Sequence, residues 1–319
     1  MNKKQTRREF IETSVKTAVG IGIASKLIPG GKAIFASETK SRVVVARNPR
    51  AINDRNQCDS AETTALFDKT LYTLTNKTTA AEAWAALGLN EKDIVAIKVN
   101  CNSWTIDLSP HKALVNALCA SLSAVIPSNS IIVYERTTGD LEEGGFKRNV
   151  SNSGVRFFGS DEGGGFDPKQ RLTRIITDKC TKVINLASLK CIEGEMAASL
   201  FLKNHIGSLI EDDMPKCHGD QDFMAEVSAR SAIKNKSILN LCDGLRGTYE
   251  RGVPWYWKGI IMSKDSVAGE AAAIGLINEK RKQEGENPLD LPESLSIAEK
   301  KYKLGTCDPK RMDVLKLEL

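Results

Sequence analysis

Short runs of consecutive apolar residues alternate along this chain with longer segments in which apolar residues recur every three or four positions. The clearest unit is DIVAIKVN at 93–100, then a segment with helical spacing that begins at Pro110, then SIIVY at 130–134. Continuous apolar strands joined by a helix are typical of a parallel sheet that is buried on both faces. The pattern therefore predicts an α/β fold.

The same pattern extends over most of the chain. Further strands are expected at 42–46, 155–159, 171–177, 182–189, 237–244 and 259–263. Further helices are expected at 60–75, 80–88, 142–150, 197–210, 222–233, 266–280 and 293–303. Asp265 or Ser266 is suited to cap the helix at 266–280, and the tail at 281–319 is polar, with the helix at 293–303 as its one expected element.

No internal repeat and no proline-rich linker interrupts this pattern. We therefore predict that residues 37–319 form a single α/β domain with a predominantly parallel sheet covered by helices on both faces. Its core is expected to contain the apolar residues at the centres of the predicted elements. These are Val95, Ile97, Leu114, Leu118, Ile132, Val133, Ile184, Leu186, Leu239, Leu241, Ile260 and Ile261.

The first 36 residues follow a different pattern. They contain Arg7-Arg8 followed by Phe10, an uncharged run at 17–25 and an ending rich in small residues. A basic head, a short apolar middle and a small-residue cleavage region are typical of a signal peptide. The paired arginines resemble a twin-arginine (Tat) signal, and an amphipathic N-terminal helix is the alternative. We predict that 1–36 is a Tat signal, recognised by the Tat translocase, and that the mature protein is periplasmic or otherwise extracytoplasmic.

Charge is distributed unevenly between this segment and the rest. The whole chain has 45 basic and 40 acidic residues, of which seven basic and two acidic lie in 1–36, so residues 37–319 have no net charge. A body without net charge lacks the basic footprint of a nucleic-acid-binding protein. The longest uncharged stretch, 113–134, contains Asn116 and Pro127. It is therefore expected to form a helix, a turn and a strand, and we predict no membrane span in the mature protein.

The eight cysteines are widely spaced. The closest pair, Cys180 and Cys191, is eleven residues apart, and no Cys-x-x-Cys occurs. This spacing excludes a contiguous ferredoxin motif and a local zinc knuckle. Disulfide bonds, and a metal or cluster held by cysteines from distant parts of the chain, both remain open.

Polar residues follow five of the predicted strands, and ligands of parallel α/β sheets bind beyond the carboxyl ends of the strands. Each residue alone could be a solvated loop residue or a helix cap, but their convergence at one edge would form a binding site. No glycine-rich nucleotide loop and no Gly-x-Ser-x-Gly elbow occurs. The residues concerned are Lys98, Asn100, Cys101, His111, Glu135, Lys190, Cys191, Glu193, Cys242, Asp243, Lys264, Asp265 and Glu270.

Seven segments, taken in order, resemble the domain-of-unknown-function family DUF362 over about 93–280. They are IKVN (97–100), SPHKALVNAL (109–118), IVYER (132–136), INLASLK (184–190), LKNHIG (202–207), LCDGL (241–245) and SKDSVAGEAA (263–272). The resemblance implies an α/β domain whose activity is not established, in a bacterial and archaeal family whose members are often exported by Tat signals. Some members carry an added ferredoxin-like iron–sulfur module, which this chain lacks.

The resemblance also singles out individual positions. Those that match the family motifs are Lys98, Asn100, His111, Glu135, Lys190, Lys203, Asn204, Gly207, Asp243 and Asp265. Two positions depart from the family pattern. This chain has Lys190-Cys191-Ile192 where relatives often have Lys-x-His, and it has Glu270 where relatives often have aspartate. Cys191 is a softer substitute for the missing histidine.

Three functions remain as alternatives at this point. The first is a redox or metal protein of the cell envelope, with an iron–sulfur cluster or a divalent metal, a redox partner, and Cys191, Cys217 and His218 as candidate ligands. The second is an enzyme or binding protein for a small anionic ligand, either phosphate or carboxylate. The third is a non-catalytic envelope protein whose polar clusters only satisfy buried backbone groups.

The second alternative assigns roles to nine residues. Lysines can hold the anion, and a histidine or an aspartate can transfer protons. The candidate catalytic residues are Lys98, His111, Lys190 and Asp243. The candidate ligand-binding residues are Asn100, Glu135, Lys203, Asn204 and Asp265.

Overall fold

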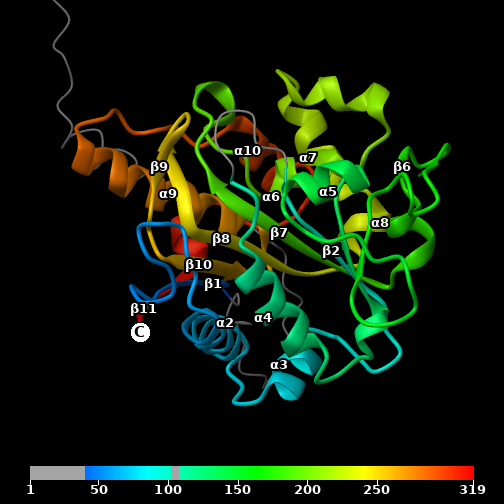
Figure 1. Cartoon of the computed structure of the whole chain (residues 1–319). Coiled ribbons are helices and arrows are strands. Elements are labelled where there is room, and N and C mark those ends of the chain that lie inside the picture. Colours follow the sequence, from blue (N-terminus) through cyan, green and yellow to red (C-terminus); the bar gives the residue numbers. More distant parts are fainter. Residues whose placement is uncertain (1–39, 102–107) are drawn as a thin grey trace, which may run out of the picture. The chain divides into compact units, whose positions relative to one another are not determined.

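The computed structural model describes residues 40–101 and 108–319, so the predicted signal segment at 1–36 lies outside the described residues. One mixed sheet runs through the described chain in the order β11-β1-β10-β8-β7-β2-β3-β4, and β9 pairs with β8 (Figure 1). The strands are β1 (Ser41–Arg47), β2 (Val95–Lys98), β3 (Ile131–Tyr134), β4 (Arg156–Phe157), β7 (Lys182–Lys190), β8 (Ser237–Glu250), β9 (Val253–Trp255), β10 (Gly259–Ser263) and β11 (Met312–Glu318). A separate two-stranded ribbon consists of β5 (Phe166–Asp167) and β6 (Leu172–Thr173).

Strand direction divides the sheet into two parts. β4, β3, β2, β7 and β8 are mutually parallel. β10 is antiparallel to both β8 and β1, whereas β1 and β11 are parallel. The sheet is therefore predominantly parallel, as predicted, and β10 and the short β9 run in the opposite direction.

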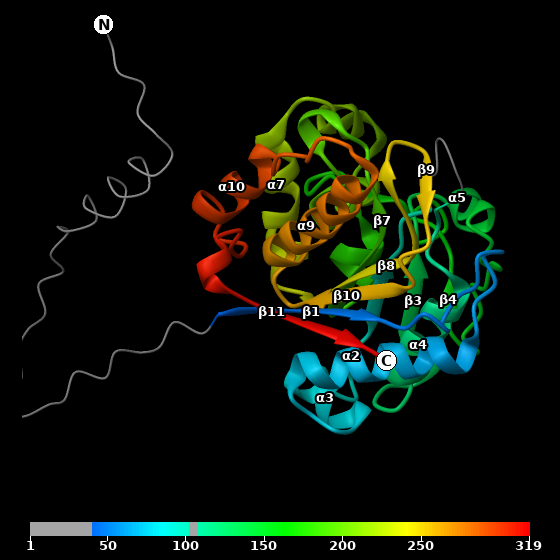
Figure 2. The same ribbon diagram turned by 90° about the vertical axis from the view of Figure 1, so that its left-hand side faces the viewer.

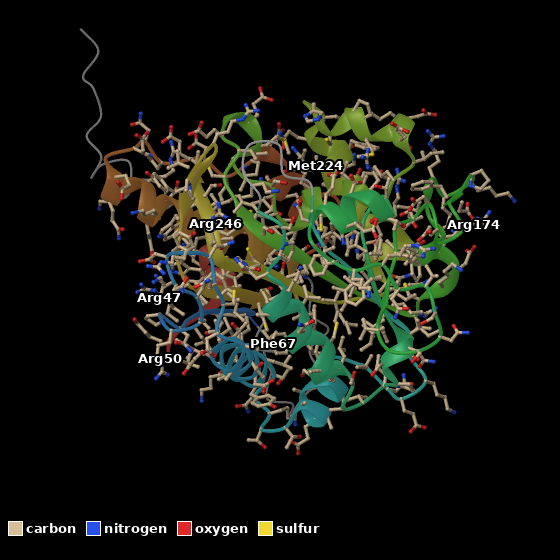
Figure 3. All side chains as sticks on the ribbon, in the orientation of Figure 1. Arg47, Arg50, Phe67, Arg174, Met224 and Arg246 are labelled. Carbon is tan, nitrogen blue, oxygen red and sulfur yellow. The ribbon has the colours of Figure 1, made fainter. Side chains whose placement is uncertain are left out.

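Helices cover both faces of this sheet (Figure 2). They are α2 (Ser60–Thr75), α3 (Ala80–Ala86), α4 (Lys112–Leu122), α5 (Thr138–Glu143), α6 (Phe201–Asn204), α7 (Gln221–Ala229), α8 (Ser231–Lys234), α9 (Ser266–Glu284) and α10 (Glu293–Lys300). One buried cluster packs beneath α2, α3 and α4, and contains Phe67; the other packs beneath α6, α7, α9 and α10, and contains Met224 (Figure 3). No helix among the described residues is long and apolar enough to cross a membrane.

The predicted core is confirmed. All twelve core residues named from the sequence have no exposed surface. β2, β3 and β10 are short and continuously apolar because they lie between two helical layers, which leaves neither face of these strands exposed to water. The α/β fold class therefore follows from the hydrophobic pattern.

Helix ends follow the local sequence closely. The Asp59 side chain accepts hydrogen bonds from the first turn of α2, and α2 ends at Asn76 in a left-handed conformation. Asp265, rather than Ser266, caps α9 by accepting the Ala268 N–H at 2.9 Å. α9 then continues to Gly285, whose positive φ of 82° suits glycine.

Several sequence-based assignments need correction. The helix expected at 197–210 is only α6 followed by a 3₁₀ turn at His205–Ser208, and the strand expected at 155–159 is only the two residues of β4. The expected strand at 171–177 is only the two residues of β6, followed by a π-helical turn at Ile175–Lys179. The helix expected at 142–150 is α5, which begins earlier because Thr137 caps it and ends at Gly144. β8 continues six residues beyond the expected end at 244. The polar tail contains β11, whose alternating burial fits an edge strand exposed on one face.

Candidate functional site

A buried ion pair lies where β2 and β3 end. Lys98 is the last residue of β2 and is 1% exposed, and Glu135 directly follows β3. The Lys98 ammonium donates to Glu135 Oε1 at 2.5 Å, to the Val99 carbonyl and to Asn204 Oδ1 at 3.3 Å. These three contacts use all three ammonium donors. Lys98 therefore anchors the strand ends and has no donor left for a ligand.

The second oxygen of Glu135 is also engaged, because it accepts the backbone N–H of Cys101 at 2.9 Å. Glu135 thus holds the chain that leaves β2 while it neutralises Lys98. A methyl group added at Gly207 would meet both Glu135 Oε1 and Lys98 Nζ at 2.9 Å. Only glycine leaves room for the ion pair at this position, which accounts physically for Gly207 in LKNHIG.

Asn204 connects this pair to β7. Its amide nitrogen donates to the Lys98 carbonyl, to Asn185 Oδ1 at 2.7 Å and to the Leu186 carbonyl. Asn185 in turn donates to the carbonyl of Phe201. Asn185 was not among the sequence-based candidates, although a polar side chain inside the apolar strand KVINLASLK was the signal that could have identified it.

Two further lysines extend this cluster: Lys190 lies near Glu135, and Lys203 lies near Lys190. Lys190 ends β7, and its ammonium lies 3.4 Å from Asn100 Oδ1. Burial lowers the pKa of Lys190 from 10.5 to about 8, Glu135 acts to raise it, and Lys203 and Lys98 lower it further. Burial also lowers the pKa of Lys203. We refer to Lys190, Lys203 and the Lys98–Glu135 pair as the lysine edge.

His111 and Asp243 form a second pair. Asp243 Oδ2 accepts the His111 backbone N–H at 2.6 Å and lies 2.8 Å from His111 Nδ1. The other ring nitrogen lies 3.0 Å from Asn56 Oδ1, a residue that the sequence analysis missed. Asn56 adopts a left-handed conformation in a surface turn, and no sequence signal connects it to His111.

The two pairs lie on opposite faces of the sheet. Lys98 points to the same face as Ala96, toward α6, whereas Asp243 points to the face of Leu241, toward α4. Asp243 also lies within β8, opposite Ser188 of β7, rather than at a strand end as predicted. The buried Ser188 hydroxyl, two residues before Lys190, has no hydrogen-bond partner among the described residues.

The expectation that Asp265 joins the other residues is wrong. β10 is antiparallel to β8, so its carboxyl end lies at the edge where β8 begins. There the Asp265 side chain caps α9 and accepts hydrogen bonds from Ser41 Oγ and from the Thr306 N–H. Asp265 therefore fastens the C-terminal segment to the sheet. It lies at the edge of the sheet opposite to the one where β2 and β7 end.

The candidate metal ligands do not form a group. All eight cysteines and all three histidines belong to the described segments, and the cysteines there are free thiols. Within residues 40–101 and 108–319, no three His, Cys, Asp or Glu side chains are grouped to hold a metal ion. Burial raises the pKa of the Cys191 and Cys217 thiols, whereas His218 is exposed. These residues do not fit an iron–sulfur cluster or a structural metal ion.

Glu270 is buried beneath α6 and caps the N-terminus of this helix, although it belongs to α9. Its Oε2 accepts the Leu202 N–H at 2.9 Å, and the Phe201 N–H also bonds to the carboxylate. Burial raises the pKa of Glu270 from 4.5 to about 7. The sequence analysis included Glu270 among the residues near a strand end, but could not show that it supports the segment that carries Lys203 and Asn204.

Comparison with known proteins gives a family and no closer relative. No curated protein and no solved structure matches the chain. A family model described as "Domain of unknown function (DUF362)" matches residues 95–275. That range covers more than half of the chain. It includes the whole lysine edge and the His111–Asp243 pair. The chain therefore belongs to the DUF362 family.

Proposed function

We propose that the lysine edge binds a small anionic ligand with a carboxylate or phosphate group. The observation that carries this proposal is the clustering of three lysines from β2, β7 and α6. Lys98 and Lys190 both interact with the Glu135 carboxylate, and Lys203 lies close enough to Lys190 to lower its pKa. One of the three, Lys98, is neutralised by Glu135, and Lys190 and Lys203 are the groups that would contact the ligand.

The energetics of burial favour an anion here. A buried ammonium has lost part of its hydration, which is why its pKa falls. A bound carboxylate or phosphate replaces the lost water with charge-assisted hydrogen bonds. With a pKa of about 8, Lys190 is mostly protonated at neutral pH. Binding should therefore weaken as the pH rises through 8.

The His111–Asp243 pair favours a second candidate function, an enzyme that transfers a proton to or from a ligand bound at the α4 face of the sheet, apart from the lysine edge. A carboxylate bonded to one ring nitrogen fixes the orientation of an imidazole and stabilises its protonated form. His111 keeps 12% of its side chain exposed, whereas Asp243 keeps 1%. His111→Ala should then abolish turnover of a bound ligand while leaving its affinity largely intact, and equal loss of both would count against this role.

The proposed anion site is tested by thermal-shift screening of the purified chain with phosphorylated and carboxylated metabolites. A ligand at one hundred times its Kd stabilises the folded protein by about 2.7 kcal/mol. Lys190→Met and Lys203→Met should each remove the shift. Lys69→Met is the matched control, because Lys69 is an exposed lysine on α2 and its replacement changes the net charge equally. No shift with any compound would refute the proposal.

We further propose that the protein acts outside the cytoplasm after export by the Tat translocase. The support is the Arg7-Arg8-x-Phe10 pattern and the concentration of positive charge in residues 1–36. A redox partner and an iron–sulfur cofactor have no comparable support in the described residues, so no chemical step is assigned to either.

A further inference from the structure

α6 carries two residues of the site but cannot stabilise itself. It is a single turn, Phe201–Asn204, continued only by a 3₁₀ turn at His205–Ser208, and helical segments this short are unstable on their own because helix nucleation is unfavourable. Its first N–H groups have no partner within the helix. The residue at its N-cap is Leu200, which has no side-chain acceptor. The helix therefore depends on a cap from elsewhere in the fold.

Glu270 of α9 is that cap. Its carboxylate bonds to the N–H groups of Phe201 and Leu202, the first two residues of α6. The Phe201 ring packs close to Gly269, where an added methyl group would meet it at 2.8 Å. This contact and the two hydrogen bonds fix α6 against α9. Asn204, at the end of the same turn, then reaches the Lys98–Glu135 pair.

The ionisation of Glu270 is governed mainly by its burial and these two N–H groups. Glu270 is 2% exposed, and its pKa of about 7 lies within the physiological range. The Cys242 thiol faces it from β8, and its own pKa is raised further by Glu270.

The other elements packed against α9 add few charged groups. β10 has no titratable residue, and α6 has only Lys203. The arginines of β1 stand at or near its two ends, and α10 has Glu293, Glu299 and Lys300. None of these residues is among the causes that shift the pKa of Glu270.

We propose that Glu270 is a positioning residue whose ionised form fixes α6 and thereby sets the affinity of the lysine edge for anions. The inference rests on the proposed anion site. Hydrogen bonds to a charged acceptor are stronger than those to a neutral one by about 1 kcal/mol, which corresponds to about a fivefold change in an equilibrium constant. Protonation of Glu270 should therefore loosen α6 and weaken anion binding about fivefold.

The consequence is a pH optimum for binding. Below pH 7 the Glu270 carboxylate becomes protonated and loses its negative charge. Above pH 8 the Lys190 ammonium loses its proton and its positive charge. Anion affinity should be highest between these values. Glu270→Gln keeps an oxygen acceptor for the N–H groups but cannot ionise. It should therefore have the weaker affinity at every pH and show no fall in affinity on the acid side.

The experiment uses the full chain, with sulfate as the probe because sulfate stays dianionic across this range. Sulfate affinity is measured by calorimetry at pH 6 and pH 7.5, and the ¹⁵N–¹H signal of Leu202 is followed over the same range without sulfate. In the wild type, affinity should be about two- to threefold weaker at pH 6 than at pH 7.5, because Glu270 is mostly protonated at the lower pH and mostly ionised at the higher. The Leu202 signal should titrate near pH 7. Both changes should be absent in Glu270→Gln.

Two other results overturn the inference in distinguishable ways. If Leu202 titrates but sulfate affinity is the same at both pH values, the cap exists and does not position the site. If sulfate does not bind at any pH, the proposed anion site is itself wrong, whatever Leu202 shows. Glu270→Asp provides a second variant in case the glutamine variant is unstable. Its carboxylate retains the charge but is one methylene shorter, so it should bind sulfate weakly and still show a fall on the acid side.

Discussion

Replacement of Lys98 by methionine should destabilise the protein strongly, because it leaves the buried Glu135 carboxylate without its cation. Methionine has a similar length and fills the same space, so the change removes charge with little change in volume. Glu135 would keep the N–H groups of Cys101 and Arg136. Breaking a buried ion pair from one side costs about 3–5 kcal/mol. Because these two N–H groups remain, we expect a loss near the lower end, about 3 kcal/mol.

The assay is urea denaturation followed by tryptophan fluorescence, with the free energy of unfolding obtained by linear extrapolation. Lys98→Met combined with Glu135→Gln should recover part of the loss, because the double variant no longer contains an unpaired charge. Lys69→Met, at an exposed position, should stay within about 0.5 kcal/mol of the wild type. A loss below about 1 kcal/mol for Lys98→Met, or simple additivity in the double variant, would refute the assignment of this pair as the anchor of the strand ends.

Three other predictions test separate parts of the structure. Gly207→Ala places a methyl group 2.9 Å from both charged atoms of the Lys98–Glu135 pair, so it should cost about 1–3 kcal/mol and weaken sulfate binding; unchanged urea midpoint and affinity would contradict the geometry. The raised pKa of Glu270 means that the folded state holds a proton which the unfolded state releases between pH 4.5 and 7. Stability should therefore fall by about 3 kcal/mol across that window and stay level above it, and Glu270→Gln should remove the fall when urea midpoints are compared at several pH values. Replacing Arg7-Arg8 by two lysines should leave the precursor in the cytoplasm in a fractionation assay, and normal export of that variant would refute the Tat assignment.

Local features of the chain determined much of the outcome. The apolar runs at 93–97, 130–134 and 182–189 coincide closely with β2, β3 and β7. Their continuous hydrophobicity indicated a sheet buried on both faces, since only such strands exclude water from both sides. The residues that follow them, Lys98 and Glu135, could be predicted to meet because parallel strands place their carboxyl ends at one edge.

Tertiary structure decided what depends on strand direction and on contacts between distant segments. Nothing in GIIMS at 259–263 shows that β10 runs antiparallel, and this direction moves Asp265 to the opposite edge. The register of β8 against β7 places Asp243 inside the sheet, facing His111 rather than Lys98. Both outcomes depend on which strands pair and in which direction. The hydrophobic pattern of a single strand does not show which strand it pairs with.

The clearest example is Glu270. In the sequence it is an acidic residue in a helix rich in small residues, with no spacing that connects it to LKNHIG. Only the packing of α9 on α6 brings its carboxylate to the N–H groups of a turn that has no cap of its own. The sequence alone determined that α9 is a helix and that Lys203 and Asn204 are polar residues in a short segment between β7 and β8. Long-range packing determined that Glu270 of α9 holds α6 in place. The hydrogen bond between Glu270 and Leu202, 68 positions apart, forms only after both helices have docked on the sheet.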